Sequence, residues 1–277
     1  MSEPVLYIVA TPIGNLADLS ERAREVLGSV DHVAAEDTRH SGRLLAHFNI
    51  KVPMISVHDH NERQRAEHVI NLLRNGESIA LVSDAGTPLI SDPGFHLVRA
   101  VREAGFRVSP VPGSCAFVAA LSASGLPSDR FQFIGFLPAK SGARLQALEA
   151  LSENTETLVF YESTHRIVDS LKAMSEAFGG DRYAVVAREL TKTFETIHGD
   201  NLEGLLEWIQ ADANQQRGEF VVLVQGAEKV LDDESINPEA ERILRILAKE
   251  MPPKKAAGVA AEITGYKKNR LYQLLID

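Results

Sequence analysis

Residues 83–94 read SDAGTPLISDPG and follow residues 79–82, a run of four apolar or small side chains typical of a buried strand. Two aspartates, two glycines and two prolines within twelve positions exclude the interior of a helix or strand. A buried strand that ends in such a loop is typical of an open α/β sheet, in which ligands bind beyond the carboxyl ends of the strands. The stretch therefore predicts a fold class and the place of a binding site.

The same alternation of apolar runs and helical patterns continues through the first half and indicates a parallel sheet covered by helices. We expect strands at residues 5–9, 32–35, 54–57, 78–82 and 107–111. A helix is expected at residues 61–75, with Gly76 where a left-handed cap belongs. Asp18 and Glu21 fit a capping box for the helix that ends near residue 27.

The second half has more closely spaced strands, which predicts a mixed sheet. Its expected strands are residues 131–136, 157–161, 183–188 and 219–224; helices are expected at residues 165–178 and 202–210, and a hairpin runs through His198. The predicted fold is α/β, with a parallel-sheet N-terminal domain, a mixed-sheet second domain and a small helical C-terminal module. We place these parts at residues 1–115, 116–226 and 227–277.

The C-terminal part differs from the rest of the chain in charge. The whole chain has a net charge of −9, which argues against a protein that coats nucleic acid, yet residues 249–277 hold six basic and three acidic side chains. An acidic run at residues 227–238 reads as a linker, and a helix follows at residues 238–249. Ala261 and Gly265 suit either a helix-turn-helix or a helical hairpin that packs against the body. The basic surplus favours nucleic acid, with Lys254, Lys255, Lys267, Lys268 and Arg270 as the RNA-binding candidates.

Composition excludes several other classes of protein. The N-terminus has about six consecutive apolar positions, too few for a signal peptide or a membrane span, so we expect a cytoplasmic protein without membrane contact. One cysteine, Cys115, excludes an intrachain disulfide, and no Cys/His spacing predicts a metal site. Residues 58–60, HDH, are typical of polar loop chemistry.

Two further glycine loops end predicted strands, TPIGN at residues 11–15 and PVPGSCA at residues 110–116. Because the carboxyl ends of parallel strands share one edge of a sheet, we expect all three loops to line one crevice. Asp84 or Thr87 could hydrogen-bond the ligand there. Residues 92–94, DPG, fit a helix N-cap, so we assign Asp92 to capping and residues 83–90 to binding.

The loops lack the motifs that hold phosphates. The first loop has no G-x-G-x-x-G, and G-x-x-x-x-G-K-[ST] is absent from the chain. A nucleoside with a cationic centre and no phosphate, such as S-adenosylmethionine, fits these carboxylate, hydroxyl and backbone groups better.

Nine motifs in register carry a resemblance to a known family: LYIVATPIGNLADLS, AAEDTRHSGRLL, HDHNE, SDAGTPLISDPG, VPGS with AFVAALSASGLP, FIGFLP, FYESTHRI, ARELTKTFE and RGEFVVLVQG. Together they resemble the tetrapyrrole methylase superfamily and, within it, the ribosomal RNA small subunit methyltransferase I family of cytidine 2'-O-ribose methylases. The resemblance implies a dimeric two-domain methylase that binds S-adenosylmethionine between its domains. It also implies a ribose hydroxyl in the decoding region of 16S rRNA, within the 30S subunit, as the target.

The resemblance assigns cofactor contacts by position in this sequence: Pro12, Ile13, Gly14, Asp84, Gly86, Thr87, Ile90, Cys115, Ala116, Tyr161, Leu190, Gly218 and Glu219. Tetrapyrrole methylases often have an aspartate where this chain has Thr87, so the carboxylate role is assigned to Asp84.

A ribose hydroxyl is a poor nucleophile, so a base or a cation that favours the alkoxide should assist transfer. The candidates are Glu36 and Asp37 with Arg39, Asn61 and Glu62, Glu162 with His165 and Arg166, and Glu189 with Lys192. Among them we favour Arg39, Glu62, Glu189 and Lys192, of which Arg39 and Lys192 suit RNA phosphate better than proton transfer. Two rival functions remain open: a C-methyltransferase of a corrin or porphyrin precursor, and a non-catalytic ligand-sensing module that binds nucleic acid.

Overall fold

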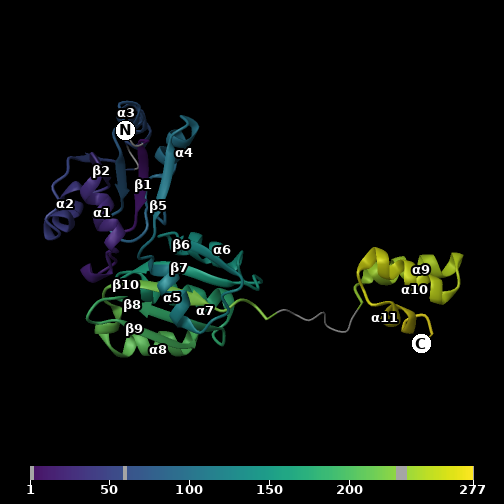
Figure 1. Cartoon of the computed structure of the whole chain (residues 1–277). Helices are drawn as coiled ribbons and strands as arrows, with labels where there is room; N and C mark the ends of the chain where they lie inside the picture. Colours follow the sequence, from purple (N-terminus) through teal and green to yellow (C-terminus); the bar gives the residue numbers. More distant parts are fainter. Residues whose placement is uncertain (1–2, 59–60, 229–235, 277) are drawn as a thin grey trace. The chain divides into compact units, whose positions relative to one another are not determined.

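The computed structural model describes residues 3–58, 61–228 and 236–276 (Figure 1). The chain divides into two compact units, Met1–Ala227 and Glu228–Asp277, and each is described by itself. Asp59 and His60 of the HDH motif lie outside the described residues, as does most of the predicted linker.

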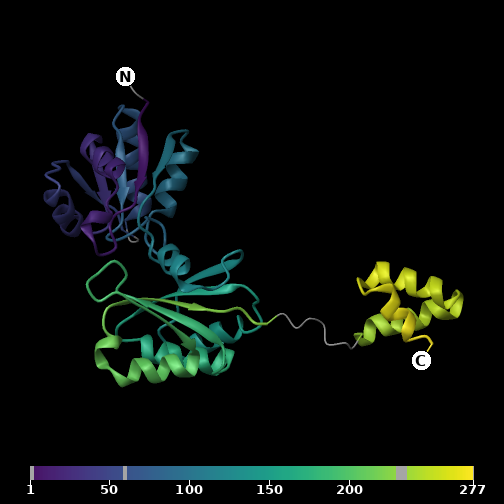
Figure 2. The same cartoon turned by 60° about the horizontal axis from the view of Figure 1, so that its bottom comes forward.

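The first sheet is parallel, as predicted, with the order β3-β2-β4-β1-β5. Its strands are β1 (Val5–Val9), β2 (His32–Ala35), β3 (Met54–Ser56), β4 (Ile79–Val82) and β5 (Arg107–Val111). The strands are short and rich in small and β-branched side chains because both faces are covered by helices. Figure 2 shows helices on both sides of this sheet.

The helices of the first half pack in two pairs. They are η1 (Leu16–Asp18), α1 (Glu21–Ser29), α2 (Thr38–His47), α3 (Glu62–Arg74) and α4 (Phe95–Glu103). Helices α3 and α4 bury Val69, Leu73 and Leu97 against one face of the sheet. Helices α1 and α2 bury Leu27 and Leu45 against the other face. A core therefore forms on each face and fixes the carboxyl ends of the strands at one edge.

Two predicted helix caps are wrong. Helix α1 is capped by Ser20, whose hydroxyl accepts from the Ala23 N–H, whereas Asp18 lies in the preceding 3₁₀ turn. Helix α4 begins at Phe95 with Gly94 as its N-cap residue, so Asp92 is not its N-cap. Instead Glu62, at the start of α3, accepts a hydrogen bond from the Leu97 N–H of α4 at 2.8 Å. A carboxylate suits this place because the N-terminus of a helix carries positive partial charge.

The second sheet is mixed, as predicted, with the order β6-β7-β10-β8-β9. Its strands are β6 (Phe131–Phe136), β7 (Thr157–Ser163), β8 (Tyr183–Arg188), β9 (Thr196–Asn201) and β10 (Glu219–Val224). Only the β6–β7 pair is parallel among these pairings. The accompanying helices are α5 (Ala116–Ser124), α6 (Ser141–Glu149), α7 (Ile167–Phe178), α8 (Leu202–Ala211) and the 3₁₀ turn η2 (Ala213–Gln216).

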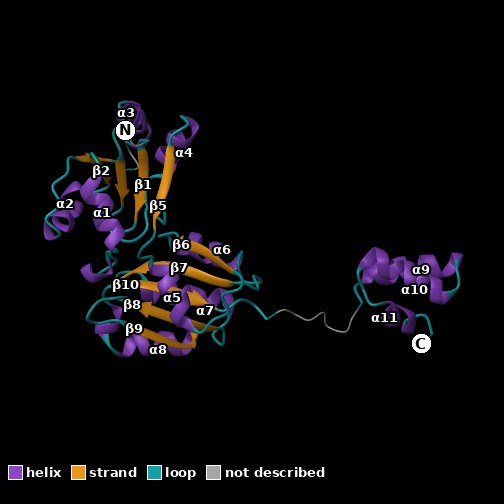
Figure 3. Ribbon diagram, viewed as in Figure 1, coloured by secondary structure: helices purple, strands orange, loops and turns teal. Residues whose placement is uncertain are grey.

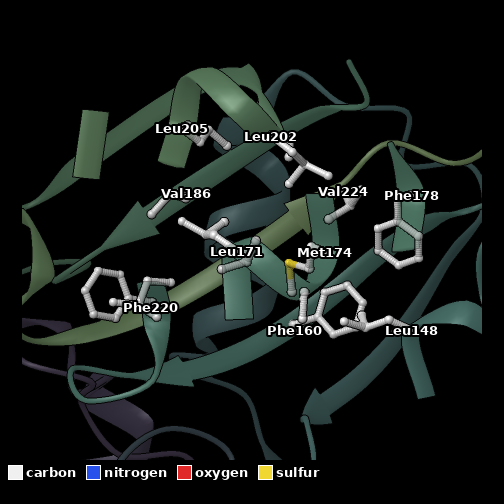
Figure 4. Close-up of a cluster of buried hydrophobic side chains, with 14 of the residues drawn as sticks. Leu148, Phe160, Leu171, Met174, Phe178, Val186, Leu202, Leu205, Phe220 and Val224 are labelled. Carbon is white, nitrogen blue, oxygen red and sulfur yellow. The ribbon is translucent and has the colours of Figure 1, made fainter. Parts of the chain in front are cut away.

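The two faces of the second sheet have different partners. Leu171 and Met174 of α7 pack against Phe160 of β7 on one face (Figure 4). On the other face, Leu121 of α5 packs against Val185. This second face also receives Ile13 from the loop after β1, so the first glycine loop reaches the second sheet.

The C-terminal unit is a small helical bundle (Figure 3) of α9 (Pro238–Glu250), α10 (Pro253–Thr264) and α11 (Lys268–Gln273). Leu244, Ala257 and Leu271 form its core. Gly265 ends α10 with φ +78°, in the left-handed region that favours glycine, so the tight turn predicted there is confirmed.

No helix in the described part of the chain is long and apolar enough to cross a membrane. Within residues 3–58, 61–228 and 236–276, no group of three or more His, Cys, Asp or Glu side chains has the arrangement of a metal site.

The cap on α4 gives a prediction about stability. Glu62 is only 4% exposed, so Glu62→Ala leaves a buried N–H without its acceptor and should lower the free energy of unfolding by about 2 kcal/mol. Glu62→Gln keeps an acceptor oxygen and should cost about 1 kcal/mol. Chemical denaturation measures both values, with the exposed Glu67→Ala on the same helix as the control. If Glu62→Ala lost activity while its free energy of unfolding stayed unchanged, the result would contradict the capping role and favour a catalytic one.

Candidate active site

The three glycine loops meet because their strands, β4, β1 and β5, are neighbours in the first sheet. Thr11 and Gly86 exchange two backbone hydrogen bonds, of 2.8 and 3.0 Å, which join the loops after β1 and β4. The Thr87 hydroxyl donates to the Ser114 carbonyl at 2.9 Å and joins the loops after β4 and β5. The expected shared crevice is therefore present.

A cavity of about 350 Å³ opens between these loops and the second sheet. Residues of the three glycine loops line one side of it: Ile13, Asp84, Ala85, Gly86, Thr87, Ile90, Ser91, Asp92, Cys115 and Ala116. Residues of the second sheet and its loops line the other side: Phe136, Tyr161, Glu162, Ser163, Ala187, Leu190, Lys192, Glu219, Phe220 and Val221. The volume and the apolar wall with a few polar groups are typical of a small-molecule site.

Unusual backbone conformations cluster around this cavity. Leu89 and Ser91, in the loop after β4, have φ +72° and +63°, and Glu189 and Thr191, after β8, have φ +51° and +66°. Residues other than glycine rarely adopt this backbone region. Each of these conformations is therefore strained and must be stabilised by the surrounding structure. Such strain is often found where a binding site needs a fixed backbone.

Asp84 connects the cavity to the loop after β2. Its Oδ1 accepts from the backbone N–H of Asp37 at 3.2 Å. Asp37 in turn forms an ion pair with Arg39 at 3.0 Å, and the hydrogen bond from the Arg39 side chain helps to lower the pKa of Asp37 to about 2. The Arg39 side chain is 87% exposed, so this cation faces solvent beside the site.

Lys192 lies between two carboxylates at the opposite wall. Its Nζ is 2.8 Å from Glu189 Oε1 and 2.8 Å from Glu219 Oε2. Burial alone would lower the pKa of Lys192, but its hydrogen bonds to the two glutamates outweigh burial and raise it. Burial likewise acts to raise the pKa of Glu189, and the hydrogen bonds from Lys192 and the Glu219 N–H bring it below its ordinary value. The site therefore holds a permanent ammonium group.

Two glycines make room for this cluster. A Cβ at Gly14, where φ is +154°, would stand 2.5 Å from Lys192 Cγ, so the lysine stem packs directly on the first glycine loop. A Cβ at Gly218, where φ is +101°, would meet the Glu189 carboxylate at 2.3 Å. Both positions need glycine for the close approach as well as for the backbone conformation.

Glu162 is a buried carboxylate in the cavity wall. It is 3% exposed and accepts from the Ser170 hydroxyl at 2.5 Å, while Arg166 lies 3.5 Å away. These partners satisfy the charge that burial would otherwise disfavour. Beside it, the Tyr161 hydroxyl accepts from the Phe117 N–H, and burial raises the pKa of Tyr161.

The structure brings most of the predicted site residues into this cavity wall, and their roles stay predictions. Pro12, Gly14 and Gly218 lie beside lining residues rather than in the wall. Glu189 contacts the cavity through Lys192. Glu62 lies outside the wall and caps α4, so its buried position favours a structural role over the catalytic one.

Sequence reasoning missed Asp92 and Phe136 in the wall, whereas Glu162 is one of the candidates that the sequence offered. The sequence DPG resembles a helix start. The observed cap of α4 is Glu62, which lies 35 residues earlier in the chain on the neighbouring helix α3. A usable signal for Phe136 was Gly135, because a glycine inside a strand pattern indicates a bulge.

The predicted RNA-binding residues lie on two helices of the C-terminal unit. Lys254 and Lys255 begin α10, Lys267 precedes α11, and Lys268 and Arg270 belong to α11. The Lys268 side chain extends along α10 at Gly258, where a Cβ would be 3.5 Å from its Nζ. Arg242 and Arg245 of α9 form ion pairs with glutamates of their own helix.

Comparisons with known proteins agree with this fold. The family model of the Tetrapyrrole (Corrin/Porphyrin) Methylases matches residues 5–206, and that of the RsmI C-terminal HTH domain matches residues 234–277. Among solved structures, the methyltransferase CobJ has a TM-score of 0.59 at 20% identity, covering 82% of this chain and 95% of its own. Uroporphyrin-III-C-methyltransferase from Thermus thermophilus has a TM-score of 0.57 at 22% identity, covering 80% and 94%. The family model covers most of the chain, so the fold is that of a methyltransferase of the tetrapyrrole methylase class.

Full-length relatives narrow this class. Ribosomal RNA small subunit methyltransferase I of Pseudomonas aeruginosa is 59% identical over 99% of this chain and 97% of its own length. The protein of the same name from Haemophilus influenzae is 56% identical over 97% and 95%. This chain belongs to the tetrapyrrole methylases and, within them, to the ribosomal RNA small subunit methyltransferase I family.

Enzymes of this class use S-adenosylmethionine, and the cavity suits that cofactor. Its apolar wall can enclose the nucleoside, and the carboxylates of Asp84 and Asp92 supply the negative charge that a sulfonium centre favours. Thr87 adds a hydroxyl already oriented by Ser114.

The contact between Gly14 and Lys192 gives a second prediction. Gly14→Ala places a Cβ where the lysine stem lies, so the ammonium group must leave its two carboxylates. We expect kcat/KM for methyl transfer to fall about tenfold through this misplacement. The exposed Gly28→Ala of α1, whose Cβ meets nothing within 4 Å, is the control and should be neutral. Wild-type kinetics in Gly14→Ala would contradict the packing role of this glycine.

Proposed function

We propose that this protein transfers a methyl group from S-adenosylmethionine to the 2'-hydroxyl of a cytidine ribose in 16S rRNA, within the 30S subunit. We further propose that it acts in the cytoplasm as a homodimer. The carrying observation is the cavity itself, in which three linked glycine loops face a second sheet that contributes Tyr161, Leu190 and Lys192. Family membership supplies the reaction class, and the relatives' names supply ribosomal RNA as acceptor.

Alignment is the main task of the site in this reaction. When bound, S-adenosylmethionine supplies a methyl group on a sulfonium centre, which leaves as a neutral sulfide. The glycine loops hold the methyl donor in a fixed position, because hydrogen bonds fix their backbones to one another. Orienting two reactants in this way can supply several kcal/mol of the barrier reduction.

Lys192 is placed to assist the acceptor hydroxyl. Its ammonium group stays charged and lies at the cavity wall, where it can stabilise the negative charge that develops on the ribose oxygen. We assign Lys192 this electrostatic role rather than proton abstraction. Glu189 and Glu219 hold the ammonium group in place.

The C-terminal unit supports RNA as the acceptor. Lys254, Lys255, Lys267 and Lys268 are exposed. They lie in or directly before the two helices α10 and α11, whereas the chain as a whole is acidic. Such a surface suits phosphate groups, which position an RNA without reading its sequence. Arg39, exposed beside the cavity, is a further phosphate contact in this proposal.

The direct test is the transfer of labelled methyl groups to unmethylated 30S subunits, followed by mass spectrometry of the RNA nucleosides. The proposal expects one 2'-O-methylcytidine in 16S rRNA. A methyl group on the base would overturn the ribose assignment. Transfer to a corrin or porphyrin precursor, with none to ribosomal RNA, would favour the C-methyltransferase. Absence of transfer to any acceptor would favour the ligand-sensing module.

The charge of Lys192 gives a third prediction. Lys192→Met keeps most of the stem that packs on Gly14 but removes the ammonium group, and kcat should fall about 10²-fold. Because the pKa of Lys192 lies above its ordinary value, the group is protonated from about pH 6 to about pH 9, so the loss should be equal across this range. Rate profiles of both proteins measure it. A loss that grows as the pH rises would identify the neutral amine as a base.

The basic surface gives a fourth prediction. Replacing its five residues, Lys254, Lys255, Lys267, Lys268 and Arg270, by Gln should weaken RNA binding about tenfold and flatten its dependence on salt. Filter binding at several salt concentrations measures both effects. The matched control replaces Arg242 and Arg245, which are paired within α9, and should bind as the wild type does. Equal salt dependence in both variants would contradict a role for α10 and α11.

A further inference from the structure

Phe136 is an aromatic side chain that lies in the cavity wall yet remains 55% exposed. It ends β6, the edge strand of the second sheet, so it stands at the rim of the cavity rather than at its floor. The floor is formed by side chains that are nearly inaccessible, among them Leu190 and Val221.

A register shift aims Phe136 at the cavity. Phe133 pairs with Val159, but the next pair is Gly135 with Phe160, so Ile134 is an extra residue in β6. Successive residues of a strand point to opposite faces, and one extra residue exchanges the faces of all that follow. Phe136 therefore pairs with Tyr161 on the cavity face. In an unshifted strand it would pair with Glu162 and face the α7 core.

Gly135 makes this shift possible. Its φ of +74° lies in the left-handed region, and a Cβ there would stand 3.2 Å from the Ser91 hydroxyl oxygen. The bulge therefore packs against the loop after β4 and places the Phe136 ring in the cavity wall.

Phe136 is also the open end of a row of rings. Tyr161 contacts Phe136 edge to face at 5.7 Å and Phe133 at 4.9 Å, and Phe133 stacks on Phe117 at 4.7 Å. Phe117, Phe133 and Tyr161 pack against the sheet. Phe136 therefore contacts Tyr161 on one side and is exposed to solvent on the other. An exposed apolar ring held in this way is a platform for another flat group.

We infer that Phe136 stacks on a nucleobase of the RNA acceptor, so that the base of the methylated nucleotide or its neighbour lies on the ring at the cavity rim. This inference rests on the proposed function. Single-stranded RNA is commonly held by splayed bases that stack on aromatic side chains. Because the Phe136 ring is 55% exposed at the rim, where the RNA must enter, we assign it to the acceptor rather than to the methyl donor that the three glycine loops hold.

The test compares Phe136→Ala, Phe136→Leu and Phe136→Tyr in methyl transfer to unmethylated 30S subunits, together with calorimetric titration of S-adenosylmethionine. Phe136→Ala should raise KM for the subunits about tenfold and leave the Kd for S-adenosylmethionine unchanged. Phe136→Tyr keeps the ring and should stay within about twofold of the wild type. Phe136→Leu keeps apolar bulk without a ring and should lose about fivefold or more.

The matched control is Phe131→Ala, at the other end of the same strand. Phe131 is 41% exposed and touches the same aromatic row through Phe117, but it does not line the cavity. Its removal should leave KM unchanged. Equal KM values for wild type and Phe136→Ala, or a weakened Kd for S-adenosylmethionine with an unchanged KM, would overturn the inference while the proposed function stands. A wild-type protein that methylates no ribosomal RNA would overturn both.

Discussion

Two backbone hydrogen bonds between Thr11 and Gly86 hold the site together, because they join loops that follow neighbouring parallel strands. The strand order β4-β1-β5 brings three loop starts to one edge, and the Thr87 contact with Ser114 completes the connection. Side chains on these loops then have fixed positions although the loops themselves have no regular structure. The wall of the cavity is rigid for a topological reason rather than through a dense apolar core.

Strain is distributed on both walls of the cavity. The left-handed residues Leu89 and Ser91 lie in the loop after β4, which lines one wall, and Glu189 and Thr191 shape the loop on the other, which carries Lys192. Each costs on the order of 1 kcal/mol or more, so the cores that flank the two sheets must stabilise them. The same loop geometry that costs stability places the Lys192 ammonium group at the cavity wall.

The sequence predicts the fold well where periodicity is strong. The strands of the parallel sheet and the glycine turn at Gly265 follow from local patterns, because apolar runs and left-handed glycines depend little on distant residues. The caps show the limit. Asp92 in DPG looks like a helix cap and Glu62 looks like a catalytic candidate, yet Glu62 caps α4 and Asp92 lines the cavity. The cap lies on another helix because α3 and α4 pack side by side, a tertiary contact that no local pattern encodes. The register of β6 is likewise set by pairing with β7 rather than by its own alternation.

The central claim is that the loop of residues 83–90 forms the wall that binds S-adenosylmethionine. The most direct measurement is the calorimetric Kd for S-adenosylmethionine of wild type and Asp84→Ala, with Asp84→Asn to retain the acceptor for the Asp37 N–H. Loss of a carboxylate beside a cationic ligand should weaken binding about tenfold in both variants with little change in stability. Equal affinity in all three proteins would contradict the account.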